Sequence, residues 1–416
     1  MTRIKACRGC GGSDLHTILS LGEVPLANRL LTGPQRHEPE PRFPLTLLFC
    51  PSCSLVQIRE TVDPETLFSH YLYFSSYSST FLAHAAAAAN LYRQQFHLGP
   101  GCLVVEIASN DGYMLRNFVA AGIPVLGIEP AANIAACARQ LGVPTLTAFF
   151  DESLATRLVS ERGPADLILA ANVLAHVADI HGFVAGIARL LAKDGAAVIE
   201  VPDLCQMIKQ SEFDTIYHEH LCYFSLHALC SLLRRHHLEL FNMEHLPIHG
   251  GSLRLYLQHM SASRSPDPAV EKRLAWELRK GVAGLDYYRS FAASVDRLRA
   301  DLLGELSRRK DAGQKLAAYG ASAKGSTLMN SFGIGSETLA FVADRSPVKQ
   351  GLYTPGNHLP VVDPAALGIR KPDAVLLLTW NFAAEILKQQ TDYLKAGGAF
   401  IVPVPTVRTL DRGNIP

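Results

Sequence analysis

The sequence predicts a multidomain α/β protein in which a small cysteine-rich module precedes two units built on parallel β-sheets. The first observation is the length of 416 residues, because a single hydrophobic core rarely organises more than about 250–300 residues. The second is the alternation of short apolar runs with helical stretches, which occurs twice along the chain. The third is a group of cysteines before the first of these runs. Together they favour an N-terminal module, a doubly wound central domain and a smaller Rossmann-like C-terminal domain.

The charge and the apolar pattern exclude several broad classes of protein. The formal net charge is +1, from 39 Lys and Arg against 38 Asp and Glu, so no global field favours a polyanion. No apolar run reaches the roughly 18–20 residues that a membrane span needs. The start, MTRIKACRGCGG, lacks the apolar segment of a secretory signal. We therefore expect a cytoplasmic protein with no nucleic-acid or membrane partner, in a reducing compartment where paired cysteines bind metal.

The cysteines of the N-terminal module have the spacing of a zinc site. Cys7 and Cys10 form one C-x-x-C pair, and Cys50 and Cys53 form a second. Each pair can sit on a tight turn that directs two thiolates at one ion, and two such turns complete a tetrahedron. The alternative is a redox or incidental role for the cysteines. Because four sulfur ligands leave no open position, the predicted zinc is structural and takes no part in chemistry.

Strand–helix alternation begins after this module. The segment 81–96 has the alanine content and apolar spacing of a helix. Short, continuous apolar runs of the kind that follow it belong to a parallel sheet covered on both faces. The runs are LVVEIA at 103–108, VLGIE at 125–129, LILAANVL at 167–174 and AAVIEVP at 196–202.

The alternation stops between about 265 and 312, where apolar residues recur at steps of three and four from Phe291 to Leu306 and indicate an amphipathic helix. It then resumes as a second α/β unit, whose runs are KLAAYGA at 315–321, LAFVADR at 339–345, AVLLLT at 374–379 and AFIVPV at 399–404. A Ser- and Pro-rich break precedes the helix. The predicted domains are a module over 1–75, a central domain over 76–262, and a helical connection with a C-terminal domain over 263–416.

The turn after the first apolar run of the central domain is a candidate ligand site. The predicted strand ends at Glu106, and the turn is formed by Ser109, Asn110, Asp111 and Gly112. Asn, Asp and Gly supply the left-handed conformations of such a turn, and ligands of doubly wound sheets bind beyond the carboxyl ends of the strands. The turn lacks G-x-G-x-x-G, so it gives little support to the binding of an NAD pyrophosphate.

An acidic residue ends the second run. Glu129 follows the turn by about twenty residues, where a carboxylate can accept hydrogen bonds from both hydroxyls of a ribose. An acid after the second strand, an E-x-x-x-N-D-G turn and no phosphate loop together resemble the core of an S-adenosylmethionine (SAM) methyltransferase more than a dehydrogenase. The sequence thus predicts SAM as the cofactor of the central domain.

The segment IEVPDL…FDTIYHEHLCYF carries four contiguous reactive residues, Tyr217, His218, Glu219 and His220. Metal binding is one alternative and a solvated loop another, but ligands only one or two residues apart rarely converge on one ion. An imidazole with an ordinary pKa near 6.5 is suited to removing a proton. Tyr217 can share a helical face with His220, which favours a general base beside a phenol.

The first turn of the C-terminal unit can bind an anion. It reads GASAKG, with Ser322, Lys324 and Gly325 at the start of a predicted helix, whose free backbone N–H groups and dipole favour a pyrophosphate. The alternative is a plain tight turn that needs small residues. The next strand ends at Asp344 with Lys349 beyond it, and this suggests a nucleoside.

In this order, the motifs resemble those of the SAM-dependent sugar C-methyltransferases, which methylate C3 of nucleotide-linked 4-keto-6-deoxyhexoses to make branched deoxysugars. The resemblance spans nearly the whole chain. It rests on the C-x-x-C pairs with LGEVPLAN and LVQ, on EIASNDG, ANVLAHV, YHEH and HGGSLR, and on YGASAKG. It implies an N-terminal zinc domain, a central SAM domain and a C-terminal domain that helps to bind the sugar nucleotide.

The resemblance also implies roles for particular residues. Asn172 would lie beside SAM, and Tyr71 or Tyr73 would close the sugar site from the zinc-domain side. The residues implied around the sugar are His220 as the base, Tyr217, Glu219 and His176.

The implied reaction starts at the ketone. The C4 carbonyl acidifies the C3 hydrogen, His220 removes it, and the enolate carbon attacks the SAM methyl group. Tyr217 or His176 would donate a hydrogen bond to the developing oxyanion, a contribution typically worth several kcal/mol.

Two functions from other classes compete with this one. An NAD-dependent sugar ketoreductase or epimerase would show G-x-G-x-x-G at the first turn. A zinc-ribbon methyltransferase or binding module for nucleic acid would show a basic, aromatic-rich face. The sequence has neither feature. The expected partner is a sugar linked to dTDP or GDP, and the expected assembly is a monomer.

Overall fold

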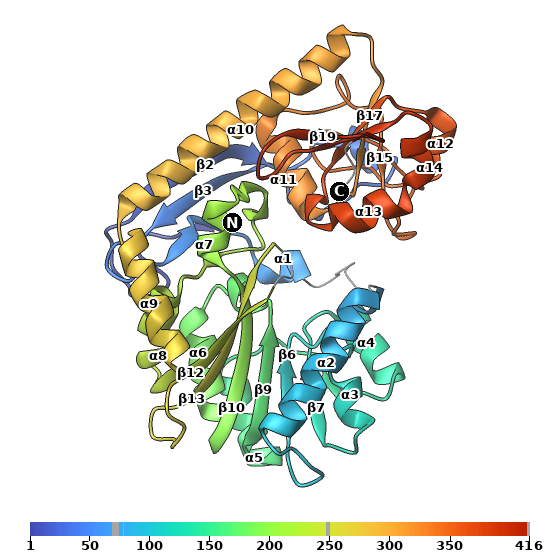
Figure 1. Ribbon diagram of the computed structural model, residues 1–416. Helices are drawn as coiled ribbons and strands as arrows, with labels where there is room; N and C mark the ends of the chain where they lie inside the picture. The colour runs from blue at the N-terminus through green and yellow to red at the C-terminus, as the bar shows by residue number, and fades with distance from the viewer. Residues whose placement is uncertain (69–74, 78, 247–249, 414–416) are drawn as a thin grey trace.

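The computed structural model describes residues 1–68, 75–77, 79–246 and 250–413. Figure 1 shows two α/β units, one below the other, with the N-terminal module on one side between them. Among the described residues, no helix combines the length and the apolar character needed to cross a membrane. The fold is mixed α/β, as the sequence predicts, and the described residues form three sheets of four or more strands.

The N-terminal module is an antiparallel sheet whose apolar strands bury one another. Its two-residue strands β1 (Thr2–Arg3) and β5 (Glu60–Thr61) pair beside it, and the short helices η1 (Gln35–His37), α1 (Pro64–Phe68) and η2 (Ser75–Tyr77) flank it in the chain. The sheet runs in the order β11 (Cys222–Tyr223), β4 (Val56–Ile58), β3 (Phe43–Phe49) and β2 (His16–Val24). One of its strands thus comes from far along the chain, outside the predicted span 1–75, and the predicted domain boundaries stay a prediction.

The central sheet contains five parallel strands and an antiparallel pair at one edge. Its strands, in spatial order, are β12 (Leu238–Leu246), β13 (Ser252–His259), β10 (Leu191–Pro202), β9 (Ala165–Ala171), β6 (Val104–Ile107), β7 (Val125–Ile128) and β8 (Thr145–Leu146). The chain proceeds from β6 toward one edge and from β9 toward the other, so the order reverses between these two strands. Ligands of doubly wound sheets bind beyond the carboxyl ends at this reversal.

Helices cover both faces of this sheet. The helical segments of the central domain, in chain order, are α2 (Ser79–Gln95), α3 (Arg116–Val119), α4 (Ala132–Gln140), α5 (Glu152–Arg162), η3 (Leu174–His176), α6 (Ile180–Leu190), α7 (Leu204–Lys209), η4 (Phe213–Thr215) and α8 (Leu226–Arg234). The four predicted runs correspond to β6, β7, β9 and β10, and the predicted helix 81–96 to α2. The apolar pattern does not predict strands β8, β12 and β13. Strand β8 has only two residues, and β12 is only partly buried.

Two helices connect this domain to the next. The predicted helical region is divided into α9 (Pro268–Lys280) and α10 (Leu285–Asp311), because Gly281 caps α9 in a left-handed conformation with a φ of 79°. The long α10 runs beside the N-terminal module toward the C-terminal domain (Figure 1). The ring of Tyr288 on α10 lies 4.6 Å from that of Phe49, centroid to centroid, so the connection shares a core with the module.

The C-terminal domain is a second, smaller doubly wound unit. Its sheet runs in the order β16 (Val361–Val362), β15 (Val342–Ala343), β14 (Leu316–Tyr319), β17 (Ala374–Leu377), β18 (Ala399–Val402) and β19 (Arg408–Leu410), with only β19 antiparallel to its neighbour. The four predicted runs correspond to β14, β15, β17 and β18. The helices are α11 (Ala323–Phe332), α12 (Ala366–Arg370), η5 (Trp380–Phe382), α13 (Ala383–Gln389) and α14 (Thr391–Lys395).

This domain is fastened to the N-terminal module by backbone and side-chain contacts. Leu31 and Tyr353 exchange both backbone hydrogen bonds, at 2.9 and 2.8 Å. The carboxylate of Glu40 accepts hydrogen bonds from the backbone N–H of Gly356 at 2.7 Å and from the His358 ring at 3.0 Å. The N-terminal module therefore contacts the C-terminal domain directly.

Candidate functional site

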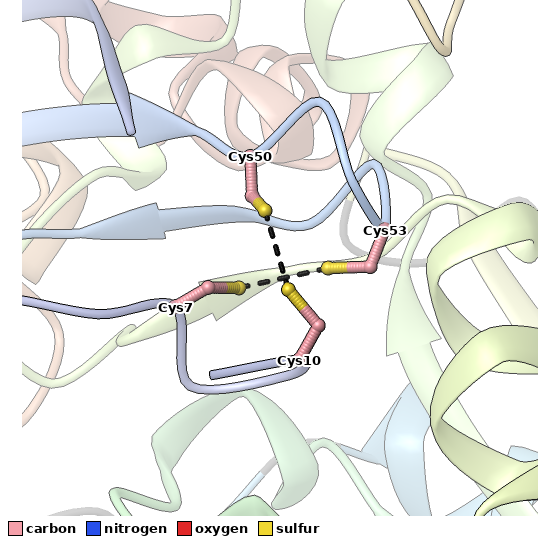
Figure 2. Close-up of side chains that lie close together, drawn as sticks. All are labelled: Cys7, Cys10, Cys50 and Cys53. Carbon is pink, nitrogen blue, oxygen red and sulfur yellow. Dashed lines mark hydrogen bonds between the residues drawn. The ribbon is translucent and has the colours of Figure 1, made fainter. Parts of the chain in front are cut away.

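The four predicted zinc ligands converge on one point. Figure 2 shows the sulfur atoms of Cys7, Cys10, Cys50 and Cys53 directed toward one another from two turns. All four lie within 4.8 Å of one another, with 3.6 Å between Cys7 and Cys53 and 3.5 Å between Cys10 and Cys50. A zinc tetrahedron with bonds of about 2.3 Å has edges of about 3.8 Å. The four sulfur atoms therefore fit a zinc ion with four sulfur ligands.

Hydrogen bonds around the Cys7 sulfur favour a thiolate there, whereas burial raises the pKa of Cys50 to about 11. Backbone N–H groups of Gly9 and Gly12 donate to the sulfur atoms of Cys7 and Cys10, at 3.3 and 3.4 Å. The buried side-chain amide of Gln57 also donates to the Cys7 sulfur, at 3.0 Å. Hydrogen bonds, first of all from the Cys53 thiol, lower the pKa of Cys7 to about 4. Because sulfur fills every position, the site suits a structural metal and offers no place for a substrate.

The turn after β6 has the backbone conformation predicted for a close approach to a ligand. Ala108, Asn110 and Gly112 have positive φ angles of 55°, 49° and 79°. A side chain at Gly127 of β7 would place its Cβ 2.5 Å from the hydroxyl oxygen of Ser109, so the turn can lie against β7 only because residue 127 is glycine. The turn therefore sits at the carboxyl end of β6, next to the reversal in strand order.

Three carboxylates gather at this turn. The carboxylate of Glu129 accepts hydrogen bonds from the backbone N–H groups of Asn110 at 3.0 Å and Ala131 at 2.9 Å. Burial raises the pKa of Glu129, and these hydrogen bonds oppose the shift. Burial also raises the pKa of Glu106 well above its ordinary value, and the negative charges of Asp111 and Glu129 add to the rise.

Such a cluster fits a cationic cofactor. One carboxylate oxygen of Glu106 and one of Asp111 are buried without a hydrogen-bond partner among the described residues. A buried carboxylate is costly unless a partner compensates it. SAM carries an ammonium and a sulfonium group, so these acceptor oxygens match its charge. The residues would hold it by hydrogen bonds and by electrostatic attraction.

The turn is also attached to the segment that leads into α2. The Asn110 side-chain oxygen accepts a hydrogen bond from the backbone N–H of Ser75 at 2.9 Å. Asp111 accepts from both the backbone N–H and the hydroxyl of Ser76, at 3.1 and 2.5 Å. The predicted sugar contacts Tyr71 and Tyr73 lie outside the described residues.

The base and the phenol predicted from the YHEH motif lie in contact, but in a turn rather than on a helix. The backbone N–H of His220 donates to the carbonyl of Tyr217 at 2.9 Å, which closes a four-residue turn. The Tyr217 hydroxyl lies 2.9 Å from Nε2 of His220. We name residues 217–220 the YHEH loop. The expectation of a shared helical face is thus corrected, because the four residues reverse direction before β11 begins.

Hydrogen bonding selects the tautomer of His220. Its Nδ1 lies 2.8 Å from the backbone carbonyl of Thr215. A carbonyl only accepts, so Nδ1 carries the hydrogen and Nε2 keeps the lone pair, into which the Tyr217 hydroxyl donates. The side chain therefore presents Nε2 as its basic atom. Thr215 contributes through its backbone, and the sequence carries no pattern that reveals this role.

His176 approaches the same imidazole from the central sheet. It ends η3, which follows β9, and its ring centroid lies 4.7 Å from that of His220 in an edge-to-face arrangement. Burial lowers the pKa of His176 to about 4. His176 is therefore neutral at neutral pH, and two imidazoles can share this space without two positive charges.

The other two residues of the YHEH loop contact the N-terminal module. Glu219 is 4% exposed, and both of its carboxylate oxygens accept from the side-chain nitrogen of Asn28, at 2.8 and 3.0 Å. The Nε2 of His218 donates to the carbonyl of Pro44 at 3.0 Å, so His218 anchors the loop and is not a second base. Sequence reasoning missed Asn28 as a site residue, although it ends the LGEVPLAN motif.

Asn172 follows the end of β9 with a positive φ of 55°, and its backbone N–H donates to the carbonyl of Glu200 at 2.8 Å. Because β9 and β6 are parallel neighbours, Asn172 lies at the same end of the sheet as the turn after β6. Its side chain is half-buried. A contact between Asn172 and SAM stays a prediction.

The predicted anion site of the C-terminal domain is a capped helix start. Ser322 is the N-cap of α11 and accepts from the backbone N–H of Gly325 at 3.1 Å. Asp344 accepts from the N–H of Ala321 at 2.7 Å, and the Lys349 ammonium donates to the Ala321 carbonyl at 2.8 Å. Asp344 and Lys349 therefore brace this turn, and a ligand role for them stays a prediction.

Lys324 extends from the same turn to the segment before the YHEH loop. Its ammonium lies 3.4 Å from a carboxylate oxygen of Glu212 and 4.9 Å from the centre of the Trp380 ring. The Trp380 indole N–H donates to the buried carboxylate of Asp214 at 2.7 Å. These contacts join the C-terminal domain to η4, which leads into the YHEH loop.

Comparison with family models supports each part of this architecture. A model described as "Putative zinc binding domain" matches residues 7–68, and one described as "Methyltransferase domain" matches residues 93–242. A third, described as "C-methyltransferase C-terminal domain", matches residues 247–405. The three models follow one another along the chain in the order of the three sheets.

Comparison with whole proteins gives a full-length relative. The chain is 38% identical over 408 residues to the C-methyltransferase NovU of Streptomyces niveus. The aligned region covers 98% of this chain and 97% of NovU. Solved structures match less extensively. The magnesium protoporphyrin IX methyltransferase of Synechocystis PCC 6803 with bound SAM has 13% identity and a TM-score of 0.33, over 42% of this chain and 78% of the other. A possible histamine N-methyltransferase of Thermotoga maritima has 20% identity and a TM-score of 0.31, over 43% and 93%. By its full-length similarity and its three matching domains, the chain belongs to the SAM-dependent C-methyltransferases that carry an N-terminal zinc-binding module.

Proposed function

We propose that the enzyme transfers a methyl group from SAM to C3 of a nucleotide-linked 4-keto-6-deoxy sugar, with His220 as the general base. The observation that carries the proposal is the hydrogen-bonded pair of His220 and Tyr217 beside His176. A carbon nucleophile at C3 requires a base for the C3 hydrogen and a donor for the oxyanion that forms at C4. This group of side chains supplies both functions.

His220 is prepared to accept one proton at a defined atom. The Thr215 carbonyl holds the hydrogen on Nδ1 and therefore leaves Nε2 to receive the C3 proton. The same carbonyl stabilises the imidazolium that results, because its negative end faces the N–H group. SAM supplies the electrophilic methyl group at the carbon that this step activates.

Tyr217 and His176 can stabilise the enolate oxygen. The Tyr217 hydroxyl donates to Nε2 of His220 in the absence of substrate. When the C3 hydrogen of the sugar approaches Nε2, it displaces this hydroxyl. Tyr217 can then donate its hydrogen bond to the enolate oxygen. His176 is neutral because burial lowers its pKa to about 4, and it adds no charge beside the imidazolium. Glu219, also in the YHEH loop, would bind polar groups of the sugar.

We assign SAM and the sugar nucleotide to the carboxyl ends of the strands, SAM in the central sheet and the nucleotide in the C-terminal sheet. For SAM we propose Glu106 of β6 and the turn after β6, with Glu129 as the ribose ligand and Asn172 beside it. The turn residues are Ser109, Asn110, Asp111 and Gly112. For the dTDP- or GDP-linked diphosphate and base we propose the start of α11; the residues there are Ser322, Lys324, Gly325, Asp344 and Lys349. The contact of Lys324 with the segment before the YHEH loop supports this arrangement.

Hydrogen exchange tests the assignment of the base. With S-adenosylhomocysteine in place of SAM, the wild-type enzyme in deuterated buffer should exchange C3 hydrogen of a 4-keto sugar nucleotide for deuterium, measured by mass spectrometry. His220→Ala should abolish the exchange. Tyr217→Phe should retain a slower exchange, because loss of one oxyanion donor typically slows catalysis about 100- to 1,000-fold. Wild-type exchange in a His220→Ala enzyme that still binds the sugar would assign the proton transfer elsewhere, with His176 as the next candidate.

A further inference from the structure

The YHEH loop is held from the side of the zinc module as well as by its own domain. Directly after it, β11 forms an edge strand of the module sheet, and the backbone N–H of Ile58 donates to the carbonyl of Leu221 at 3.0 Å. Within the loop, His218 donates to the carbonyl of Pro44 in β3. The backbone of the proposed catalytic segment is therefore placed by hydrogen bonds to the module.

The same sheet connects this segment to the zinc ligands. Gln57 pairs with Cys222 of β11 through the backbone, and its buried side chain donates to the sulfur of Cys7 at 3.0 Å. Its side-chain oxygen accepts from the backbone N–H of Arg8 at 3.0 Å. One residue thus joins a zinc ligand to the strand that begins two residues after His220.

Asn28 is a side chain of the module that reaches the loop. It is exposed itself, whereas the Glu219 carboxylate that it contacts is 4% exposed. Its segment is fixed on both sides: Val24 ends β2 in register with Phe43, and Leu31 pairs with Tyr353 of the C-terminal domain. An amide presented from such a segment has a defined position.

The chemistry of this contact suits orientation of a carboxylate. A neutral amide donates to a carboxylate through charge-assisted hydrogen bonds, which are about twice as strong as neutral ones. Because the amide has no charge, it fixes the two oxygens and leaves the negative charge in place, whereas lysine or arginine would neutralise it. Asn28 therefore fixes the orientation of the Glu219 carboxylate.

We infer that Asn28 is a positioning residue of the C-methyltransferase site, through which the zinc module orients Glu219 toward the sugar. The inference rests on the proposed function, since it uses the role assigned there to Glu219. Asn28 acts through Glu219 and does not itself touch the substrate in this proposal. Its loss is therefore expected to change turnover or sugar binding and to leave SAM binding and the zinc site intact.

Steady-state kinetics of Asn28→Ala and Asn28→Asp test this. Asn28→Ala should lower kcat/KM for the sugar nucleotide about 10- to 100-fold, the loss that a small misplacement of a catalytic group produces. Asn28→Asp has nearly the same size but replaces the donor with an acceptor, so it should be at least as impaired. The SAM Kd by calorimetry and the zinc content should equal those of the wild type. Glu23→Ala, an exposed residue of the same LGEVPLAN motif, is the matched control.

A double-mutant cycle separates positioning from a general structural role. If Asn28 acts through Glu219, Asn28→Ala combined with Glu219→Gln should be no slower than Glu219→Gln alone, because residues of one network are not additive. Multiplied losses in the double variant, restored activity in Asn28→Asp, or lost zinc would overturn the inference. Wild-type kinetics of Asn28→Ala beside an impaired Glu219→Gln would overturn it too. An unimpaired Glu219→Gln would instead contradict the role of Glu219 in the proposed function.

Discussion

At the scale of single residues, burial of His176 lowers its pKa and makes the stability of the fold depend on pH. Its folded-state pKa of about 4 lies below the value of about 6.5 for an exposed histidine. Between these values the unfolded chain binds more protons than the folded one, so the stabilising contribution is complete above about pH 6.5 and is lost as the pH falls toward 4.

We predict that His176→Asn flattens this part of the stability profile. The slope of the unfolding free energy against pH should fall by up to about 1.4 kcal/mol per pH unit relative to the wild type. Urea denaturation at several pH values between about 4.5 and 7 measures it. Parallel profiles for the two proteins would mean that His176 has no lowered pKa.

Glu129 is held at the end of β7 by two backbone N–H groups, and this fixes the direction of its carboxylate. We predict that Glu129→Ala weakens SAM binding about 100-fold, because two hydrogen bonds to a charged acceptor are lost, at about 1.5 kcal/mol each. Calorimetric titration with SAM gives the affinity, and a thermal scan shows whether the turn itself is destabilised. Glu161→Ala, on the exposed surface of α5, is the control. An unchanged Kd for Glu129→Ala would reject this position for SAM.

At the scale of elements, the zinc turns lie at the ends of strands of the module sheet. The two C-x-x-C turns lie opposite each other, and their sulfur atoms point toward one another (Figure 2). The metal therefore fastens the segment before β2 to the turn between β3 and β4. Free energy of metal binding becomes free energy of folding at such sites.

We predict one zinc ion per chain and a loss of folding, rather than of chemistry alone, in Cys50→Ser. Metal analysis of the purified protein and a thermal unfolding scan measure the two effects. Cys102→Ser replaces a half-buried cysteine outside the cluster and should keep its zinc. A zinc-free wild type, or a Cys50→Ser variant that unfolds like the wild type and loses only turnover, would contradict a structural role.

At the scale of the whole molecule, the segment with the proposed base lies between three domains. Its N-terminal side meets the C-terminal domain, where Phe213 stacks on Phe332 with ring centroids 4.6 Å apart and Trp380 donates to Asp214. Its C-terminal side continues as a strand of the zinc module. Substrate bound to one domain can therefore influence side chains that another domain supplies.

Lys324 gives a prediction at this scale. Lys324→Ala should raise KM for the sugar nucleotide about 10- to 100-fold, because a hydrogen bond between charged groups contributes about 1.5–3 kcal/mol. The Kd for SAM should stay unchanged. Lys388→Ala removes an exposed lysine from α13 of the same domain and is the control. Equal KM values for Lys324→Ala and the wild type would place the diphosphate elsewhere.

Local patterns in the sequence determined the zinc ligands and most of the parallel strands. Two C-x-x-C pairs predict a metal site from sequence, because the spacing alone places two thiolates on one turn, independently of the rest of the fold. Buried parallel strands such as β9 and β17 are readable because both of their faces must be apolar. Short or half-exposed strands such as β8 and β12 lack that signal and were missed.

The arrangement of the site depended on the tertiary structure. The sequence predicts contact between Tyr217 and His220, but on a helix instead of in a turn. The hydrogen bond from His220 Nδ1 to the Thr215 carbonyl, which only the tertiary structure shows, makes Nε2 the basic nitrogen. Asn28 reaches Glu219 across 191 positions of sequence, and β11 joins a sheet whose other strands end before residue 59. Periodicity reports which face of an element is buried, but hydrogen bonds between distant segments follow from how the domains pack.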